Sequence, residues 1–153
     1  MEAMKIMLVD DEERFLSTTK KLLTKKGIDV VTATSGAEAL EMLQNKYVHV
    51  VILDVKMPGM DGNETLKEIK NRFPLVEVIM LTGHATIESA IDGLKCGATD
   101  YLMKPTEIDE LIVKAKEAFR KRLLVEEKIY MAQSRSYRKS PREILKEAEK
   151  TAR

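Results

Sequence analysis

The chain has 153 residues, 44% hydrophobic and 33% charged, which is the composition of a globular domain large enough to bury a sizeable core. The single cysteine, Cys96, excludes an intramolecular disulfide, and no apolar run is long enough to span a membrane. The N-terminus lacks the long apolar stretch of a signal peptide, so we expect a cytoplasmic protein with no membrane partner.

The net charge of +1 conceals an uneven distribution. Residues 120–153 contain 11 Lys and Arg against 5 Asp and Glu, whereas residues 1–119 contain 15 against 20. An acidic body followed by a basic tail indicates two regions with different roles.

Short apolar runs alternate with helical patterns along the acidic body. The first half predicts a strand at Lys5–Val9, a helix at Glu12–Lys26 that ends at Gly27, a short strand at Val30–Thr32, and a helix from the capping box at Ser35–Glu38 to about Asn45. The second half predicts a strand at Val48–Leu53, a helix from a second capping-box pattern at Asp61–Glu64 to about Arg72, a strand at Val76–Leu81, a helix at Thr86–Lys95, a strand at Asp100–Met103, and a final helix that begins at Thr106–Asp109.

This alternation amounts to five βα units, and it favours an α/β fold with a parallel sheet that is covered by helices on both faces. Crossovers between the strands are expected to be right-handed. Ligands of such sheets bind beyond the carboxyl ends of the strands, so the residues just after each apolar run are the candidates for function.

Those residues are Asp10 and Asp11 after the first strand, Asp54 after the third, Thr82 after the fourth and Lys104 after the fifth. Carboxylates that converge in a small space repel one another, and a hard dication such as Mg²⁺ removes that repulsion. A carboxylate can accept a phosphoryl group, and an ammonium then neutralises charge on the phosphoryl oxygens. The pattern therefore predicts a phosphoryl-transfer site with Asp54 as the nucleophile.

Each residue also has an ordinary structural explanation. An acidic pair before a helix is often an N-cap, an Asp before Pro and Gly often forms a turn, and a Lys before Pro is often solvated. A tyrosine such as Tyr101 in a strand is often half-buried packing. The functional interpretation depends on all of these residues falling at strand ends together.

Four motifs give the chain a specific resemblance: Asp10–Glu12, Leu53–Gly62, Met80–Gly83 and Gly97–Pro105. In order and spacing they resemble the response-regulator receiver family over roughly residues 4–122, and most closely the receivers of nitrogen-regulation-type activators. The resemblance implies a flavodoxin-like (βα)5 fold with strand order 2-1-3-4-5. It divides the chain into a receiver domain at 1–122 and a basic helical tail or linker at 123–153.

The resemblance also implies a role for each site residue. Asp54 becomes the phosphoacceptor, and Asp10 and Asp11 bind Mg²⁺ together with Asp54 and the backbone carbonyl of Lys56. Lys104 contacts the phosphoryl group, and His84 and Lys56 flank the phosphate. Thr82 and Tyr101 form the switch, and the Lys104–Pro105 bond is cis. The implied function is a phosphorelay switch that is phosphorylated by a sensor histidine kinase and catalyses only its own phosphorylation and dephosphorylation.

Three other functions share features with this one. A haloacid-dehalogenase-like phosphatase has a second acid two residues after its nucleophile, where this chain has Lys56. A flavodoxin-like flavin binder needs a phosphate cradle after the first strand, where this chain has acidic residues. A DNA-binding regulator whose output domain is missing remains compatible with the sequence.

The tail continues the last helix, since Ile108 to about Gln133 contains no Gly or Pro. Residues 134–139 are predicted to form a loop, and Ser140–Glu143 resembles a new helix start. The tail is compatible with a linker, a homodimer element, a nucleic-acid contact or a solvated helix. It lacks a helix-turn-helix core and interleaved aromatics, so nucleic-acid binding is not expected of this chain alone.

Overall fold

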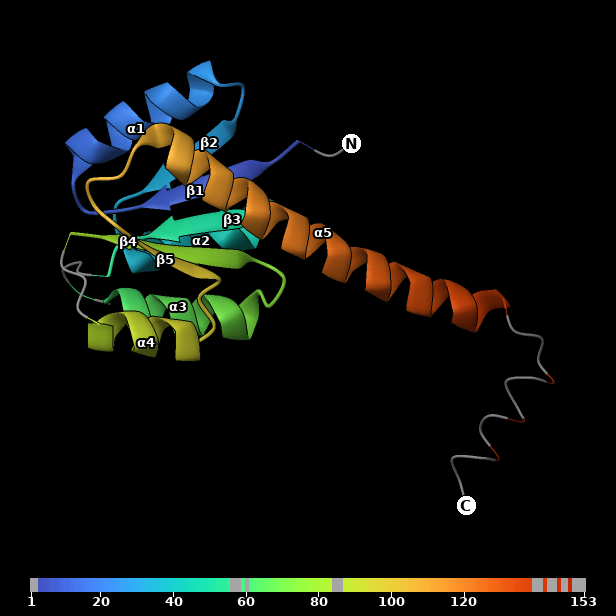
Figure 1. Ribbon diagram of the computed structural model, residues 1–153. Helices are drawn as coiled ribbons and strands as arrows, with labels where there is room; N and C mark the ends of the chain where they lie inside the picture. Colours follow the sequence, from blue (N-terminus) through green and yellow to red (C-terminus); the bar gives the residue numbers. More distant parts are fainter. Residues whose placement is uncertain are drawn as a thin grey trace. The chain divides into compact units, whose positions relative to one another are not determined.

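Five parallel strands form one sheet in the order β2-β1-β3-β4-β5, which confirms the predicted topology (Figure 1). The computed structural model describes residues 3–55, 59, 61–83, 87–138, 142, 146 and 149. The strands are β1 (Lys5–Val9), β2 (Asp29–Ala33), β3 (Val50–Leu53), β4 (Glu77–Thr82) and β5 (Asp100–Met103). Because all five run the same way, their carboxyl ends meet at one edge of the sheet.

Helices cover both faces of this sheet (Figure 1). They are α1 (Glu13–Lys25), α2 (Gly36–Asn45), α3 (Gly62–Arg72), α4 (Ile87–Lys95) and α5 (Ile108–Arg138). Helix α1 and the first part of α5 lie on one face, and α2, α3 and α4 lie on the other. The chain divides into two units, Met1–Arg122 and Leu123–Arg153, so α5 belongs to both.

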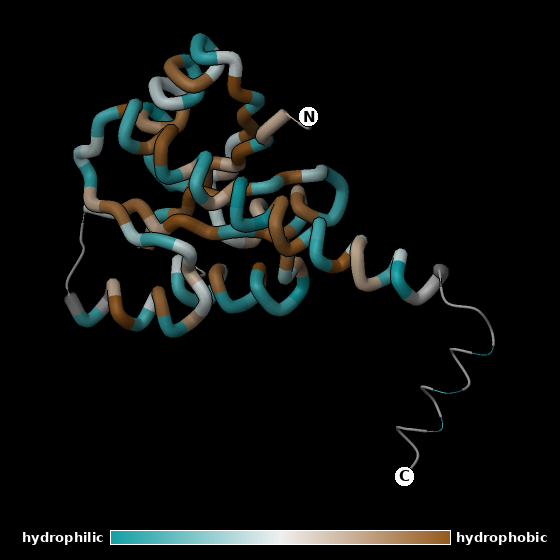
Figure 2. The backbone as a smooth tube through the Cα atoms, turned by 45° about the vertical axis from the view of Figure 1, so that its right-hand side comes forward, coloured by the Kyte–Doolittle hydropathy of each residue, from teal (hydrophilic) through white to brown (hydrophobic). Residues whose placement is uncertain are grey.

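Two hydrophobic clusters hold the sheet between these helix layers. Alternate residues of β1 contribute to opposite clusters, because successive side chains of a strand point to opposite faces. Met7 and Val9 pack with α2 and α3, whereas Ile6 and Leu8 pack with α1 and α5. Figure 2 shows the result, with hydrophobic residues concentrated in the strands and alternating with hydrophilic ones along the helices.

Both predicted capping boxes begin helices as expected. The Ser35 hydroxyl accepts a hydrogen bond from the Glu38 N–H at 3.1 Å, and the Asp61 carboxylate accepts one from the Glu64 N–H at 2.8 Å. Each bond satisfies a backbone donor that the first helical turn leaves without an intrahelical partner. The Asp61 cap places the start of α3 close in sequence to Asp54.

The opposite edge of the sheet, where the strands begin, is closed by buried polar and aromatic groups. His49 is fully buried, and its Nδ1 accepts a hydrogen bond from the Lys5 N–H at 3.0 Å. Its ring meets the Phe119 ring edge-on at a centroid distance of 4.7 Å. The buried Arg122 donates from Nη1 to the Val48 carbonyl at 2.5 Å. These contacts hold α5, as far as Arg122, against the residues just before β3.

One prediction for the tail is wrong. Residues 134–138, expected to form a loop, continue α5 to Arg138. Serine, tyrosine and arginine are poor evidence for a break, because only Gly or Pro strongly interrupts helical hydrogen bonding, and residues 108–138 contain neither. The helix start predicted at Ser140–Glu143 falls on residues 140, 141 and 143, which lie outside the described residues.

Among the helices that the structure describes, none combines the length and the apolar character needed to cross a membrane.

Candidate functional site

The carboxyl edge of the sheet holds its candidate residues by backbone hydrogen bonds that extend past the strands. The Asp54 N–H donates to the Val9 carbonyl at 2.9 Å, and the Lys104 N–H donates to the Thr82 carbonyl at 2.9 Å. The Asp10 N–H donates in the same way to the carbonyl of Ala33, the last residue of β2, at 3.1 Å. These side chains therefore start from backbone positions as fixed as those of the sheet itself.

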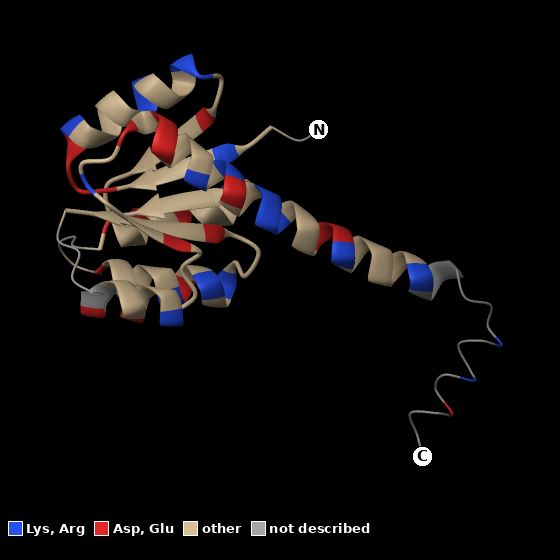
Figure 3. Cartoon of the chain, viewed as in Figure 1, with Lys and Arg blue, Asp and Glu red and all other residues tan. Residues whose placement is uncertain are grey.

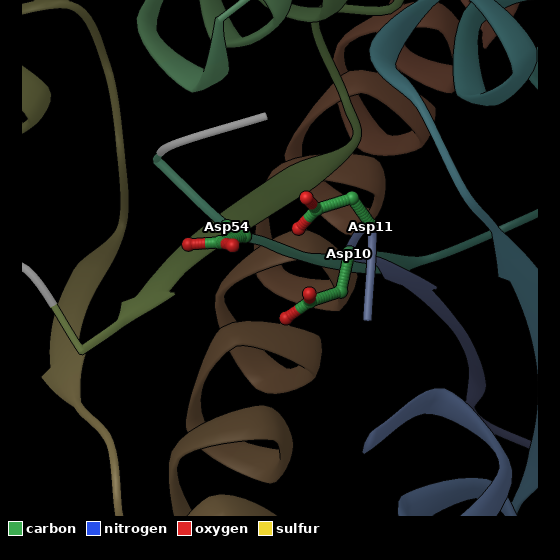
Figure 4. A group of neighbouring side chains, drawn as sticks. All are labelled: Asp10, Asp11 and Asp54. Atoms are coloured by element: carbon green, nitrogen blue, oxygen red, sulfur yellow. The ribbon is translucent and has the colours of Figure 1, made fainter. Parts of the chain in front are cut away.

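Asp10, Asp11 and Asp54 form a cluster of three acids (Figure 4). Each offers a carboxylate oxygen, and these oxygens lie within 4.8 Å of one another. Asp10 and Asp54 are only 2% and 6% exposed, whereas Asp11 faces solvent. Figure 3 shows that the loop between β1 and α1, which carries two of the acids, is strongly acidic. The structure thus brings together the three carboxylates that the sequence predicted to converge.

The cluster fits a hard divalent cation. Its donor atoms are carboxylate oxygens, which such cations prefer. Asp54 Oδ1 is buried, and no described residue hydrogen-bonds to it. A buried acceptor without a hydrogen bond is costly, and a bound cation satisfies it. The predicted backbone ligand at Lys56 and the flanking His84 both lie outside the described residues.

Its surroundings alter the acidity of Asp10. Burial raises its pKa above the usual value, and the hydrogen bond from Lys104 acts in the opposite direction. Its Oδ1 accepts a hydrogen bond from the Glu12 N–H at 2.9 Å, and its Oδ2 accepts one from Lys104 Nζ at 2.5 Å. The Lys104 ammonium and the Glu12 N–H therefore both favour the ionised form of Asp10.

Lys104 supplies that charge from the loop after β5. Its Nζ also lies 3.8 Å from Glu12 Oε1 and 4.1 Å from the centroid of the Phe15 ring. The Lys104–Pro105 peptide bond is cis, as predicted. Sequence reasoning missed Phe15, because an aromatic residue on an amphipathic helix is indistinguishable from ordinary core packing.

Thr82 and Tyr101 lie on neighbouring strands. Thr82 is fully buried as the last residue of β4, and Tyr101 is half-buried in β5 opposite Met80. Since Met80 and Thr82 are two residues apart, strand geometry places Thr82 on the same face as Tyr101. The Tyr101 ring packs over α4, because a Cβ atom at Gly93 would lie 3.4 Å from its Cδ2. This face connects the edge of the acid cluster to α4.

Known proteins share both the sequence pattern and the fold. The family model of the response regulator receiver domain matches residues 6–116. An NtrX-like response regulator of Rickettsia bellii is 39% identical over 120 residues, which cover 77% of this chain and 25% of that protein. The DNA-binding transcriptional regulator NtrC of Escherichia coli K12 is 38% identical over 113 residues, covering 74% and 24%. The chain thus spans about a quarter of the length of these curated relatives.

A solved structure agrees with these relatives. The response regulator receiver domain protein of Clostridium thermocellum superimposes with a TM-score of 0.75 at 39% identity, covering 80% of this chain and 98% of that one. The family match includes β1 to β5 and the first part of α5. The chain therefore belongs to the response regulator receiver domain family of two-component signalling, and it is similar to the receivers of NtrC- and NtrX-like regulators.

Proposed function

We propose that this chain is a phosphoacceptor switch in which Asp54 takes a phosphoryl group from a sensor histidine kinase. The observation that carries the proposal is the arrangement at Asp54. Its buried carboxylate has one oxygen without a hydrogen bond from any described residue, and two further acids lie within 4.8 Å. Lys104 is held next to the same cluster through Asp10.

Asp10, Asp11 and Asp54 are the side chains that would hold Mg²⁺, and the backbone carbonyl of Lys56, which lies outside the described residues, is the proposed fourth protein ligand. Bound Mg²⁺ supplies positive charge that offsets the charge on the phosphoryl oxygens. A site with few protein ligands leaves room for water and phosphoryl oxygens, so we expect weak binding of Mg²⁺ in the absence of phosphate.

In the proposed transfer, a carboxylate oxygen of Asp54 forms a bond to phosphorus while the phosphorus–nitrogen bond of the kinase phosphohistidine breaks. The electron pair of that bond leaves with the imidazole, which departs as a neutral ring because its other nitrogen already carries a proton. The Lys104 ammonium offsets charge on the transferring group, and the Thr82 hydroxyl donates a hydrogen bond to a phosphoryl oxygen. Withdrawal of that hydroxyl toward the phosphoryl group lets the Tyr101 ring change its position against α4.

We propose that the receiver occupies residues 1–122 and that residues 123–153 form a basic helical tail or linker. The similarity to NtrC- and NtrX-like regulators supports a histidine kinase as the phosphoryl donor. NtrC is a DNA-binding regulator, and the chain spans only about a quarter of it. We therefore place the output of the switch in a further domain or a partner protein.

Mass spectrometry of the intact chain tests the phosphoacceptor directly. After incubation with acetyl phosphate and Mg²⁺, we expect the wild type to gain about 80 Da, the mass of one phosphoryl group. We expect Asp54→Asn to gain nothing, because an amide oxygen cannot form the acyl phosphate. Asp92→Asn, which changes an exposed acid of α4, is the matched control and should be phosphorylated like the wild type.

Two further samples test the metal. Excess EDTA should prevent the mass gain in the wild type, and Asp11→Ala should prevent it while circular dichroism shows an unchanged fold. Full hydroxylamine-labile phosphorylation of Asp54→Asn would show that another residue is the acceptor. Undiminished phosphorylation in EDTA would show that no divalent cation takes part.

A further inference from the structure

The Lys104 ammonium has two close partners of different chemical kinds. One is the carboxylate of Asp10, with Nζ and Oδ2 2.5 Å apart. The other is the face of the Phe15 ring, with Nζ 4.1 Å from the ring centroid. The Lys104 side chain is 16% exposed, Asp10 is 2% exposed and Phe15 is half-buried, so water has limited access to both pairs. A third group, Glu12, is 3.8 Å away but largely exposed, so water weakens its attraction.

The two close partners differ in what happens when a metal ion binds. Asp10 belongs to the acid cluster, so a divalent cation there attracts the same carboxylate that holds the ammonium. A metal ion and the Lys104 ammonium at one carboxylate repel each other, so the ion pair between Asp10 and Lys104 weakens. The Phe15 ring attracts the ammonium through its quadrupole and is not a ligand for Mg²⁺. The ring is therefore the partner that the metal ion does not compete for.

The fold fixes the ring in this position. Phe15 lies in the first turn of α1 and packs against the hydrophobic cluster between α1, α5 and the sheet. Leu102 of β5 belongs to the same cluster. Lys104 follows Leu102 by two residues, so it starts toward the same face of the sheet. The contact thus depends on α1 and on the loop after β5, neither of which contains Asp54.

We propose that Phe15 is a positioning residue for Lys104, whose ammonium its ring face retains at the edge of the acid cluster when Asp10 binds the metal ion. This inference rests on the proposed function, because it assigns Lys104 to the transferring phosphoryl group. Phe15 itself touches neither the phosphoryl group nor the metal ion. Its contribution is to keep the ammonium within reach of both.

Stepwise fluorination of the Phe15 ring tests the proposal in the full chain. Each fluorine weakens the attraction of the ring for a cation while changing its size little. We expect the rate of phosphorylation by acetyl phosphate at saturating Mg²⁺ to fall with each fluorine, by about threefold to tenfold at trifluorophenylalanine. Phe15→Leu should lose at least as much, and Phe15→Tyr should retain most of the rate because it keeps an electron-rich ring.

A readout that needs no phosphorylation follows the same contact. In NMR spectra of the Mg²⁺-loaded protein, the ε-methylene protons of Lys104 should be shifted upfield by the ring, and Phe15→Leu should remove this shift. Fluorination of Phe73, which packs against the cluster on the other face of the sheet, is the matched control and should change neither the rate nor these protons.

The results separate this inference from the proposed function. If the wild type takes no phosphoryl group, the proposed function fails, and the Lys104 protons alone decide whether the ring retains the ammonium in the Mg²⁺-loaded protein. If the wild type is phosphorylated but fluorination of Phe15 leaves its rate unchanged, Phe15 is packing only and the inference is wrong. An absent upfield shift with Mg²⁺ bound would overturn it equally.

Discussion

Gly62, the first residue of α3, lies directly against the backbone of Asp54. A Cβ atom at position 62 would be 2.4 Å from the Asp54 carbonyl oxygen and 2.5 Å from Cα of Val55. The Gly62 N–H also donates to the Val55 carbonyl at 2.7 Å. Helix α3 therefore begins against the segment that carries the candidate phosphoacceptor, and the absence of a side chain permits this approach.

Substitution of this glycine should disturb the site as well as the fold. In Gly62→Ala the new methyl group overlaps backbone, which cannot rotate away as a side chain can. We expect the free energy of unfolding to fall by about 1–3 kcal/mol and phosphorylation of Asp54 to slow. Urea denaturation and the rate with acetyl phosphate measure the two effects. Lys67→Ala, an exposed change in the same helix, is the control, and equal behaviour of both variants would contradict the prediction.

The predictable part of this molecule is the part that depends on periodicity. Apolar runs separated by helical patterns were sufficient to predict the five strands, and strand ends were sufficient to predict where Asp10, Asp54 and Lys104 converge. Each of these inferences requires only the position of a residue on one face or at one end of a helix or strand. The strand order, in contrast, came from the resemblance to a family.

The unpredictable part depends on contacts between side chains from distant elements. Lys104 meets Phe15 across 89 positions, and Arg122 meets the Val48 carbonyl across 74. Neither pair has a local pattern, because each partner is an ordinary residue of its own helix or loop. The helical state of residues 134–138 was missed for another reason: polar residues weakly favour a turn, and helix continuation outweighs that preference.

The half-buried Lys70 predicts a pH dependence of stability. Its Nζ donates to the carbonyls of Pro74 at 3.0 Å and Val76 at 2.9 Å, and burial lowers its pKa below the usual 10.5. Between the lowered value and 10.5, the folded state binds fewer protons at Lys70 than the unfolded state does. The contribution of Lys70 to the free energy of unfolding therefore rises with pH in this window.

A comparison with Lys70→Met isolates the contribution of Lys70. We expect the stability of the wild type relative to Lys70→Met to increase as the pH is raised toward 10.5, because only the wild type has the titrating group. Denaturant unfolding at several pH values provides the measurement. Lys67→Met, which replaces an exposed lysine of the same helix, is the matched control. A relative stability that stays constant or falls with pH would contradict the prediction.

The part of α5 beyond Arg122 predicts self-association. Several of its apolar side chains are exposed, namely Leu124, Ile129, Tyr130 and Met131. Leu124 and Met131 lie seven residues apart on one side of the helix, and an antiparallel pair of such helices centred on Met131 covers both of them. It also places Glu127 of one copy near Arg135 of the other. We propose a second copy of this chain as the partner, in an association that phosphorylation strengthens.

Sedimentation of the full chain and of a 1–122 truncation, each with and without acetyl phosphate, measures this association. We expect only the full chain to form dimers, and more of them after phosphorylation. The double variant Leu124→Glu, Met131→Glu should remain monomeric while its receiver domain is still phosphorylated. Monomers in every sample would show that the exposed apolar residues do not pair.

Thr82 predicts a separation between accepting the phosphoryl group and responding to it. Thr82→Ala should still be phosphorylated, because Asp54, the acids proposed to bind Mg²⁺ and Lys104 remain. It should lose the conformational response, because the phosphoryl group then has no hydroxyl at position 82 to attract. The Tyr101 ring therefore keeps its position against Gly93. The phosphoryl group shifts the equilibrium between the two conformations only by its different affinity for each, a few kcal/mol, so removing one hydrogen bond removes much of that difference.

NMR of Tyr101 and of residues 87–96 before and after phosphorylation measures the response, and Thr82→Ser, which keeps the hydroxyl, should restore it. If Thr82→Ala showed the full set of shifts of the wild type, the coupling would have to run through another element, since the Tyr101 ring would then move without the hydroxyl.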